Sequence, residues 1–184
     1  MRIISGKARG TKLYTLEGEN TRPTLDRVRE SVFNIIQAQI PDSIVLDLFS
    51  GSGAIGLEFA SRGAKKVYMC DNSRKAVEII NKNIEKTHLQ EKVELYNCDF
   101  KLLISKIAKE EKFDFIYLDP PYKTRYIKQA IENLLSSNHI DDETMIVAET
   151  DEQDIVLEDI KELNLKIIDL RKYGRANIIF LKRA

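Results

Sequence analysis

Residues 44–63 read IVLDLFSGSGAIGLEFASRG, and this stretch decides the fold. The run at 44–49 is apolar apart from Asp47, as in a strand that is buried on both faces of a parallel sheet. A glycine-rich turn follows, and the residues from about 54 to 62 predict a helix. A buried strand that leads through a glycine loop into a helix is the first unit of an α/β domain.

The same alternation of strand and helix continues on both sides of this unit. Further strands are predicted at 65–71, 92–99, 113–119, 144–150, 163–174 and 175–183. One further helix is predicted to begin at 23–24, and three more are predicted at 74–86, 102–109 and 127–135. Only Tyr173 and Gly174 separate the last two strands, which predicts an antiparallel pair at one edge. We therefore predict a doubly wound, Rossmann-like α/β fold with a seven-stranded, mostly parallel sheet at 23–184, and a basic extended arm or hairpin at 1–22.

Composition favours a single folded domain in a reducing compartment. The 184 residues are 43% hydrophobic and 32% charged, and no apolar run approaches the ~20 residues of a membrane span. The first ten residues have no apolar core that could act as a secretory signal, so we expect a cytoplasmic protein. Cys70 and Cys98 are expected to be structural thiols. His88 and His139 have no partner at ligand spacing, so no metal site is predicted.

Charge is divided unevenly along a chain whose net charge is zero. Residues 1–12 contain Arg2, Lys7, Arg9 and Lys12 and no acid. Residues 141–162 contain ten acids and the single base Lys161. One face could meet a polyanion while another faces water, or both could simply be solvated surfaces.

The glycine loop and the acids around it predict the cofactor. Gly51, Gly53 and Gly56 have the G-x-G-x-x-G spacing, and Asp71 lies twenty residues beyond Gly51, where an acid can accept both hydroxyls of a ribose. The negative charge of Asp47 would repel a pyrophosphate group, whereas it would attract the cationic amino-acid tail of a ligand. S-adenosylmethionine is therefore the predicted cofactor, with a nicotinamide dinucleotide and a purely structural loop as the alternatives.

Asp99 and Asp119 lie at the ends of two further predicted strands. Together with Asp47 and Asp71 they place four acids at the same edge of the predicted sheet. Asp99 is interpreted as the acceptor for the adenine amino group, or as the N-cap of the next helix, and the two roles are compatible. The residues predicted to hold the cofactor at this edge are Asp47, Ser50, Gly51, Gly53, Asp71, Asn72, Asp99 and Phe100.

Together, 47–56, Asp71, Asp99 and the DPPY tetrad at 119–122 resemble the amino-methylating class I S-adenosylmethionine-dependent methyltransferases. The runs RIISGKARG at 2–10 and RPTLDRVRESVFNII at 22–36 resemble the bacterial RsmD family more closely, and the resemblance covers nearly the whole chain. It implies methylation of the N2 amine of one guanine in small-subunit ribosomal RNA. It also implies that Thr24 and Arg27 lie near the methionine tail of the cofactor.

The tetrad suits an exocyclic amine, whose lone pair is delocalised into the ring and must be oriented. Asp119 can accept one amine hydrogen and the carbonyl of Pro120 the other, with the ring of Pro121 stiffening the backbone behind them. Tyr122 offers a flat face for a flipped-out base. The alternative is that the tetrad merely ends a strand.

Cations near the tetrad and in the arm favour a structured RNA, which ribosomal RNA would be in the free state or in an assembling small subunit. The residues predicted to contact RNA are Arg2, Lys7, Arg9, Lys12, Arg22, Lys123, Arg125 and Tyr126. No residue indicates guanine specifically, so an adenine or another nucleic-acid amine stays open. An RNA-binding module without activity and an NAD-dependent oxidoreductase are the alternatives outside this class.

Overall fold

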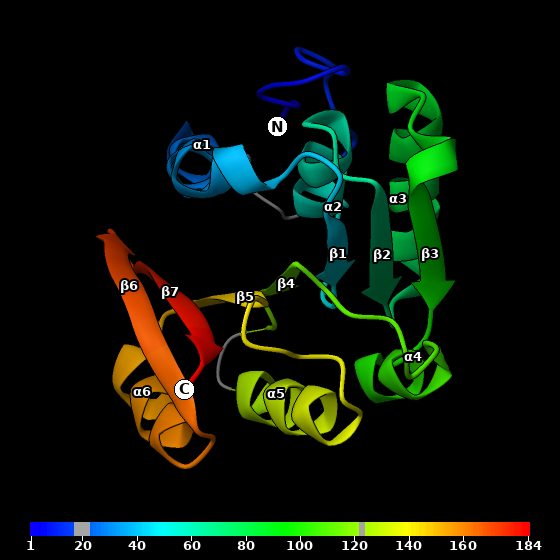
Figure 1. The fold of residues 1–184 in the computed structure, drawn as a ribbon. Coiled ribbons are helices and arrows are strands. Elements are labelled where there is room, and N and C mark those ends of the chain that lie inside the picture. The colour runs from blue at the N-terminus through cyan, green and yellow to red at the C-terminus, as the bar shows by residue number, and fades with distance from the viewer. Residues whose placement is uncertain (17–22, 122–123) are drawn as a thin grey trace.

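The computed structural model describes residues 1–16, 23–121 and 124–184, with the side chains of 23–25 left out of the description. Within these ranges a seven-stranded sheet has the order β3-β2-β1-β4-β5-β7-β6 (Figure 1). The strands are β1 Ile44–Asp47, β2 Lys66–Asp71, β3 Val93–Asn97, β4 Phe115–Leu118, β5 Met145–Thr150, β6 Leu165–Tyr173 and β7 Ala176–Arg183. Strands β1 to β5 are parallel, and β7 is antiparallel to both of its neighbours. The predicted fold, including the antiparallel pair at one edge, is confirmed.

Six helices cover the two faces of the sheet. They are α1 Pro23–Ile36, α2 Ala54–Ser61, α3 Arg74–Thr87, α4 Phe100–Lys106, α5 Tyr126–Ser136 and α6 Gln153–Lys161, with short 3-10 turns at Gln37–Gln39 and Gln90–Lys92. In Figure 1, α1, α2 and α3 lie on one side of the strands, and α4, α5 and α6 lie on the other. The chain therefore alternates between two helical layers around one sheet.

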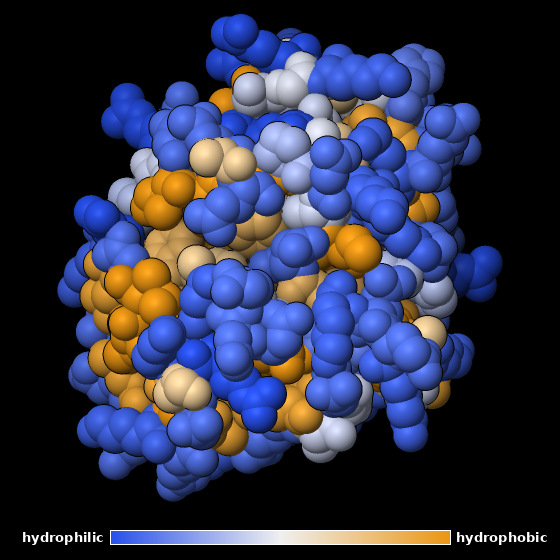
Figure 2. All heavy atoms as spheres, viewed as in Figure 1, coloured by the Kyte–Doolittle hydropathy of each residue, from blue (hydrophilic) through white to orange (hydrophobic). Residues whose placement is uncertain are grey.

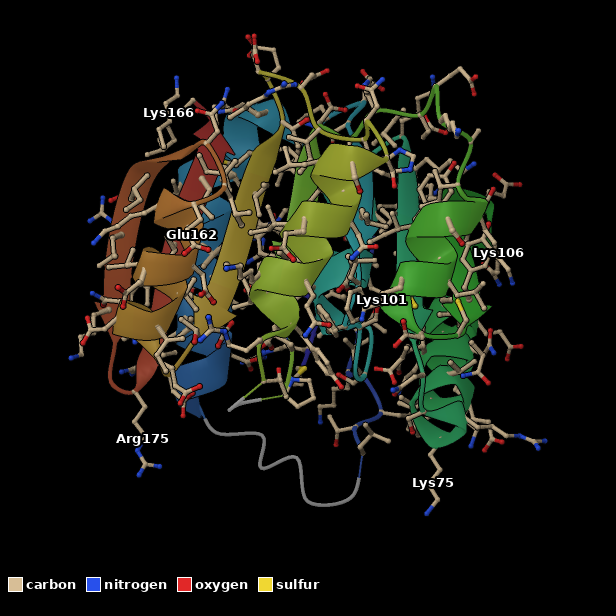
Figure 3. The ribbon with its side chains drawn as sticks, turned by 90° about the horizontal axis from the view of Figure 1, so that it is seen from below. Lys75, Lys101, Lys106, Glu162, Lys166 and Arg175 are labelled. Atoms are coloured by element: carbon tan, nitrogen blue, oxygen red, sulfur yellow. The ribbon has the colours of Figure 1, made fainter. Side chains whose placement is uncertain are left out.

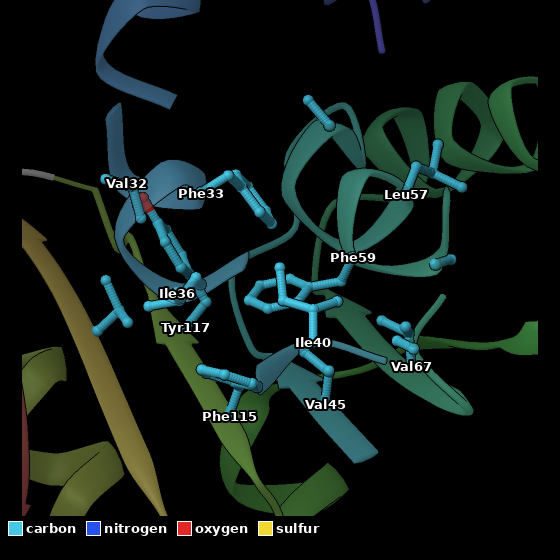
Figure 4. Packing of buried hydrophobic residues seen from close by; sticks show 14 of the residues in the cluster. Val32, Phe33, Ile36, Ile40, Val45, Leu57, Phe59, Val67, Phe115 and Tyr117 are labelled. Atoms are coloured by element: carbon cyan, nitrogen blue, oxygen red, sulfur yellow. The ribbon is translucent and has the colours of Figure 1, made fainter. Parts of the chain in front are cut away.

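Each face of the sheet has its own hydrophobic core, because successive residues of a strand point to opposite faces. Phe115 and Tyr117 of β4 belong to the core beneath α1 and α2, whereas Ile116 and Leu118 belong to the core beneath α4 and α5. Figure 4 shows Phe33 of α1 pointing toward Phe59 of α2, and the ring centroids of the two lie 4.7 Å apart. Since every residue of β4 is buried, this strand reads as one continuous apolar run.

No element is predicted from the sequence between 150 and 163, where the structure has α6. Val156 and Ile160 are buried on this helix at a spacing of four residues, which is the helical signal. The many acids around these two residues indicate a charged surface, and the spacing of the apolar residues among them is the signal that predicts a helix. Helix α4 also begins at Phe100, earlier than predicted, because the side chain of Asp99 caps it by accepting a hydrogen bond from the Lys101 N–H at 2.9 Å.

The predicted basic arm packs against α2 over the residues that the structure describes. Ile3 is 1% exposed and belongs to the same core as α1 and α2. The backbone N–H groups of Ile4 and Ser5 donate to the carboxylate of Glu58 at 2.8 and 3.0 Å. Residues 1–16 are therefore held against the domain and form what we call the N-terminal segment.

The outer surface is mostly hydrophilic in the view of Figure 2, with hydrophobic atoms gathered on the side where β6 lies. Ile167 and Ile168 of this edge strand are each 47% exposed. Figure 3 shows charged side chains such as Lys101, Lys106 and Glu162 on the outside of the helices. Among the described helices, none has the length and apolarity that crossing a membrane would require.

Candidate active site

Two cavities open at the edge of the sheet where the parallel strands end. The first, which we call the α1 cavity, has a volume of about 230 Å³ and is lined in part by Asp26, Arg29, Asp47, Tyr117 and Glu149. The second, the β2–β3 cavity, has a volume of about 500 Å³ and is lined in part by Asp71, Asn72, Asp99, Phe100 and Pro120. Phe49, Gly51 and Asp119 line both cavities, so the two meet at the carboxyl ends of β1 and β4.

The β2–β3 cavity brings together acids that the sequence analysis selected. One oxygen of Asp71 accepts a hydrogen bond from the Gly51 N–H at 3.0 Å, and the other accepts from the Ser73 N–H at 2.8 Å. These bonds hold the carboxylate between the end of β2 and the glycine loop. Asp99 caps α4, as one of its two interpretations predicted, and a carboxylate has lone pairs left for a ligand as well.

Three aromatic rings form part of the wall of the β2–β3 cavity. Phe49 and Tyr126 are stacked with an angle of 5° between their planes and 6.1 Å between their centroids. Phe100 lies 5.2 Å from Phe49 and 5.5 Å from Tyr126. Phe49 is not among the site residues predicted from the sequence, and Tyr126 is predicted there to contact RNA. A stack of this kind suits a flat heterocycle, which can pack on exposed ring faces.

The glycine loop contributes more to packing than its motif suggests. Gly53 has φ +83°, a conformation that favours glycine, and it caps α2. A Cβ atom at Gly56 would lie 2.7 Å from the sulfur of Met69, so this glycine lets α2 pack closely on β2. The Gly56 N–H donates to Asp47 at 3.1 Å.

Asp47 is a buried carboxylate on the wall of the α1 cavity. It is 1% exposed, and burial raises its pKa to about 7, against the opposing effect of the hydrogen bond from Gly56. The hydroxyl of Ser50 donates to the backbone carbonyl of Asp47 at 3.0 Å. A cation bound beside Asp47 would favour its charged form.

Arg29 lines the same cavity and is 5% exposed. Its Nη2 atom donates to the backbone carbonyl of Arg2 and to Asp26, the latter at 3.2 Å. Its Nε and Nη1 atoms are buried, and no residue in the described ranges accepts a hydrogen bond from them. Burial lowers the pKa of Arg29, and Glu58 and Asp26 oppose that effect. A buried guanidinium with two unused donors suits a carboxylate ligand.

Two residues of α1, Thr24 and Arg27, are predicted from the sequence to lie near the cofactor tail. Arg27 is exposed and does not line either cavity, and the side chain of Thr24 lies outside the described residues. Arg29 could have been found from helical periodicity. It precedes the buried Val32 and Phe33 by three and four residues, which puts all three on one face of α1.

The tetrad is described as far as Pro121. Asp119 lies at the junction of the two cavities, Pro120 is buried, and Pro121 is exposed beside the β2–β3 cavity. Tyr122 lies outside the described residues, as do Lys123 and Arg22. Their predicted roles stay predictions.

A further acid, Glu149 near the end of β5, also reaches the α1 cavity. It is 9% exposed, and its Oε2 atom accepts a hydrogen bond from the hydroxyl of Tyr117 at 3.0 Å. Burial raises the pKa of Glu149, and the bond from Tyr117 opposes this. The sequence analysis counted Glu149 only as one of the acids of 141–162. The rule that selected the other strand-end acids would have found it.

The cations predicted to contact RNA lie in two environments. Arg2, Lys7, Arg9 and Lys12 are exposed on the N-terminal segment, whose Met1 lines the α1 cavity and whose Leu16 lines the β2–β3 cavity. Met1 and Leu16 thus bring the two ends of the segment to the cavities, whereas Lys7 lies beside the C-terminal end of α2, where its N–H donates to the carbonyl of Ser61 at 2.8 Å. The guanidinium of Arg125, in contrast, forms an ion pair with Asp159 of α6 at 2.5 Å.

The cysteines lie side by side at the ends of β2 and β3, with their sulfur atoms 3.9 Å apart. The thiol of Cys70 donates to the Cys98 carbonyl at 2.9 Å, and burial raises the pKa of Cys70. His139 is buried, and its ring nitrogens lie 2.9 and 3.2 Å from the carbonyls of Glu111 and Ile104. In the described ranges, no group of three His, Cys, Asp or Glu side chains could hold a metal ion.

Comparisons with known proteins found a matching family model, similar sequences and similar structures. The family model described as Conserved hypothetical protein 95 matches residues 1–182. YlbH of Bacillus subtilis is 35% identical over 186 residues, spanning 100% of this chain and 99% of that protein. A Haemophilus influenzae protein named ribosomal RNA small subunit methyltransferase D is 33% identical over 179 residues, or 94% of this chain and 93% of that protein. The solved structure of yhhF from Escherichia coli superposes with a TM-score of 0.83 at 28% identity, covering 100% of this chain and 97% of that one.

Proposed function

Since this chain belongs to the RsmD family, whose model matches residues 1–182, we propose that it is an S-adenosylmethionine-dependent methyltransferase acting on the N2 amine of a guanine in small-subunit ribosomal RNA. One observation carries the proposal. Two cavities meet at Asp119, and each offers the groups that one half of this cofactor needs. The name of the relative from Haemophilus influenzae supports a ribosomal RNA substrate.

The β2–β3 cavity suits the adenosine half. Asp71 would accept the ribose hydroxyls and Asp99 the adenine amino group, and the rings of Phe49, Phe100 and Tyr126 would pack on the adenine. Asn72 also lines this cavity.

The α1 cavity suits an amino-acid tail with both charges. The two unused donors of Arg29 fit the α-carboxylate, and Asp47 would stabilise the ammonium group, with Ser50 and Gly51 beside them. A nicotinamide dinucleotide fits poorly, because four acidic residues of this cavity would repel its two phosphates and Arg29 alone among the described lining side chains could pair with them. The acids are Asp26, Asp47, Asp119 and Glu149. These charges support S-adenosylmethionine, which when bound supplies an electrophilic methyl group on a sulfonium.

The chain's own contribution to the reaction is orientation. Asp119 would accept one hydrogen of the target amine, and the carbonyl of Pro120 the other, so that the nitrogen lone pair points toward the cofactor. Asp119 then offsets the positive charge that develops on the nitrogen. Pro121 stiffens the backbone behind these acceptors. In this proposal Tyr122 stacks on the flipped-out base, and Thr24 supports the cofactor tail.

The substrate is proposed to be ribosomal RNA in the cytoplasm, free or in an assembling small subunit. Arg2, Lys7, Arg9 and Lys12 are exposed on the N-terminal segment, whose two ends reach the cavities, and phosphates of a structured RNA could contact them along this segment. Arg22 and Lys123 would extend this contact. Arg125 would have to exchange its ion pair with Asp159 for a phosphate.

Transfer of a labelled methyl group from S-adenosylmethionine into small-subunit RNA, followed by nucleoside analysis, tests the proposal. We expect labelled N2-methylguanosine, and we expect Asp119→Ala to lower the single-turnover rate by about 10²–10³-fold in a folded enzyme. Labelled N6-methyladenosine would instead support the adenine alternative. No label in RNA or its precursor particles, with calorimetry showing NAD binding, would support the oxidoreductase.

A further inference from the structure

Two acidic residues from neighbouring strands line the α1 cavity. β4 and β5 are parallel, and the last pair in their register is Leu118 with Ala148. Asp119 follows the last residue of β4, Glu149 is the next residue of β5, and both line the α1 cavity. Neighbouring strands run ~4.7–4.9 Å apart. A ligand at this point therefore meets two acceptors side by side.

Glu149 is fixed through one oxygen only. Its Oε2 atom accepts the Tyr117 hydroxyl at 3.0 Å, and among the described residues no other hydrogen bond to its side chain is found. Tyr117 is itself 1% exposed and packed in the core beneath α1, so it is a rigid support. Glu149 is 9% exposed, and an ionised carboxylate has more lone pairs than this one bond uses, so its side chain can accept a further hydrogen bond from a ligand in the cavity.

The order of the sheet places Glu149 on the substrate side. The groups proposed to hold the cofactor follow β1, β2 and β3, and β5 lies beyond β4 on the other side of β1. Glu149 also lines a small pocket beside Pro120 and Pro121. It is therefore closer to the proposed position of the target base than to the adenosine half of the cofactor.

We propose that Glu149 recognises guanine by accepting a hydrogen bond from its N1–H, beside the N2 amine that Asp119 accepts. On guanine these two donors are adjacent, whereas adenine and cytosine carry an unprotonated ring nitrogen next to their amine. Two neighbouring carboxylates match the first pattern and repel the second. This inference rests on the proposed function, and it supplies the guanine preference that no sequence motif indicated.

The other groups around Glu149 are compatible with this role. Arg29 and Asp26 line the cavity from α1, and Asp47 lines it from β1. Burial raises the pKa of Glu149, and a donor from the base would favour the ionised carboxylate again. The competing explanation is that Glu149 and Tyr117 only stabilise the fold.

A base analogue separates recognition from stability. 2-Aminopurine keeps the reactive N2 amine and lacks the N1 hydrogen and O6. Small-subunit RNA can be ligated from transcripts and a synthetic segment that carries guanine or 2-aminopurine at the position methylated in the previous assay. The quantity to measure is the ratio of kcat/KM for the two RNAs.

We expect the wild type to prefer guanine, and Glu149→Gln to reduce this preference by roughly 10- to 100-fold. The glutamine amide can donate to the unprotonated N1 of 2-aminopurine. Loss of O6 affects both enzymes alike, so the change in the ratio reports on N1. Glu143→Gln, the same substitution just before β5 begins, is the matched control and should keep the wild-type ratio.

Equal losses on both RNAs, with an unchanged ratio, would overturn the inference and leave a structural role. So would a wild type that methylates 2-aminopurine as fast as guanine, a result that does not depend on the folding of any variant. Melting temperature and S-adenosylhomocysteine affinity are measured on the same preparations. If the wild type forms no N2-methylguanosine, the proposed function itself fails.

Discussion

At the residue scale, Asp47 shows how a binding site costs stability. Its pKa is about 7 because it is buried, compared with an ordinary value of 3.8. Ionisation of Asp47 therefore destabilises the folded state relative to the unfolded one. This destabilisation is absent below the pKa of Asp47 in the unfolded state and grows as pH rises through 7, because the folded state binds the proton of Asp47 more tightly than the unfolded state does.

We predict that Asp47→Asn stabilises the ligand-free protein at pH 8, by up to about 4 kcal/mol, and that the gain shrinks as pH falls toward 4. Asparagine can still accept from the Gly56 N–H and carries no charge to bury. Urea unfolding of both proteins at several pH values measures this difference. Parallel stability curves would show that Asp47 is not the group responsible.

Arg29 makes a second prediction at this scale, because its two unused donors suggest a carboxylate ligand. The wild type should bind S-adenosylhomocysteine roughly 10- to 100-fold more tightly than the decarboxylated analogue, which keeps the amine. Arg29→Gln should abolish this preference. Calorimetry with both ligands measures it.

Arg27→Gln is the control, two residues away on the same helix and exposed. It should keep the wild-type preference for the carboxylate. The reverse pattern, with the preference lost in Arg27→Gln and kept in Arg29→Gln, would restore the assignment made from the sequence.

At the scale of elements, the N-terminal segment is attached to α2 through a turn at Gly6. Gly6 has φ +83°, and a Cβ there would lie 1.9 Å from the backbone oxygen of Ser61. The Lys7 N–H donates to the same oxygen at 2.8 Å. No side chain fits without moving the segment away from α2.

We predict that Gly6→Ala destabilises the protein by about 1–3 kcal/mol more than Gly10→Ala does. Gly10 has nearly the same φ, +85°, with no atom within 4 Å of an added Cβ, so it controls for backbone strain. Denaturant unfolding of the two variants gives the difference. Equal losses would mean that the segment does not depend on this close approach.

At the scale of the whole molecule, the uneven charge along the chain becomes an uneven surface. Lys128 of α5 lies 2.5 Å from Glu162, and Lys182 of β7 lies 3.4 Å from Glu143. Part of the acidic 141–162 region is thus matched by bases of its own domain. The cations of the N-terminal segment form no ion pair with a described residue.

We predict that changing Arg2, Lys7, Arg9 and Lys12 together to Ala weakens RNA binding and leaves S-adenosylhomocysteine affinity unchanged. Every phosphate that the variant no longer neutralises should reduce the slope of log affinity against log salt by ~0.7–0.9. Filter binding over a salt series measures both the affinity for RNA and this slope. A matched variant changes the exposed Lys65, Lys106, Lys109 and Lys166, and equal effects of the two variants would indicate nonspecific attraction only.

The order of the elements and the edge of the sheet where the site lies could both be predicted from the sequence. Buried strands, glycine turns and amphipathic helices are local patterns, so the order of elements and the acids Asp47, Asp71, Asp99 and Asp119 could be predicted from residue spacing. Helix α6 was not predicted, because ten acids lie in 141–162 and the helical spacing of Val156 and Ile160 is a weak signal among them.

Which residues from distant parts of the chain meet depends on how the elements pack, and it could not be predicted from the sequence. Asp119 and Glu149 are thirty positions apart in the chain, and they become neighbours because β4 pairs with β5. Arg29 lines the α1 cavity and Arg27 does not, because the packing of α1 on the sheet fixes which face is buried. Burial then sets the pKa of Asp47 and leaves two donors of Arg29 unused. Desolvation and contact between distant residues depend on the packed whole, and no local pattern contains them.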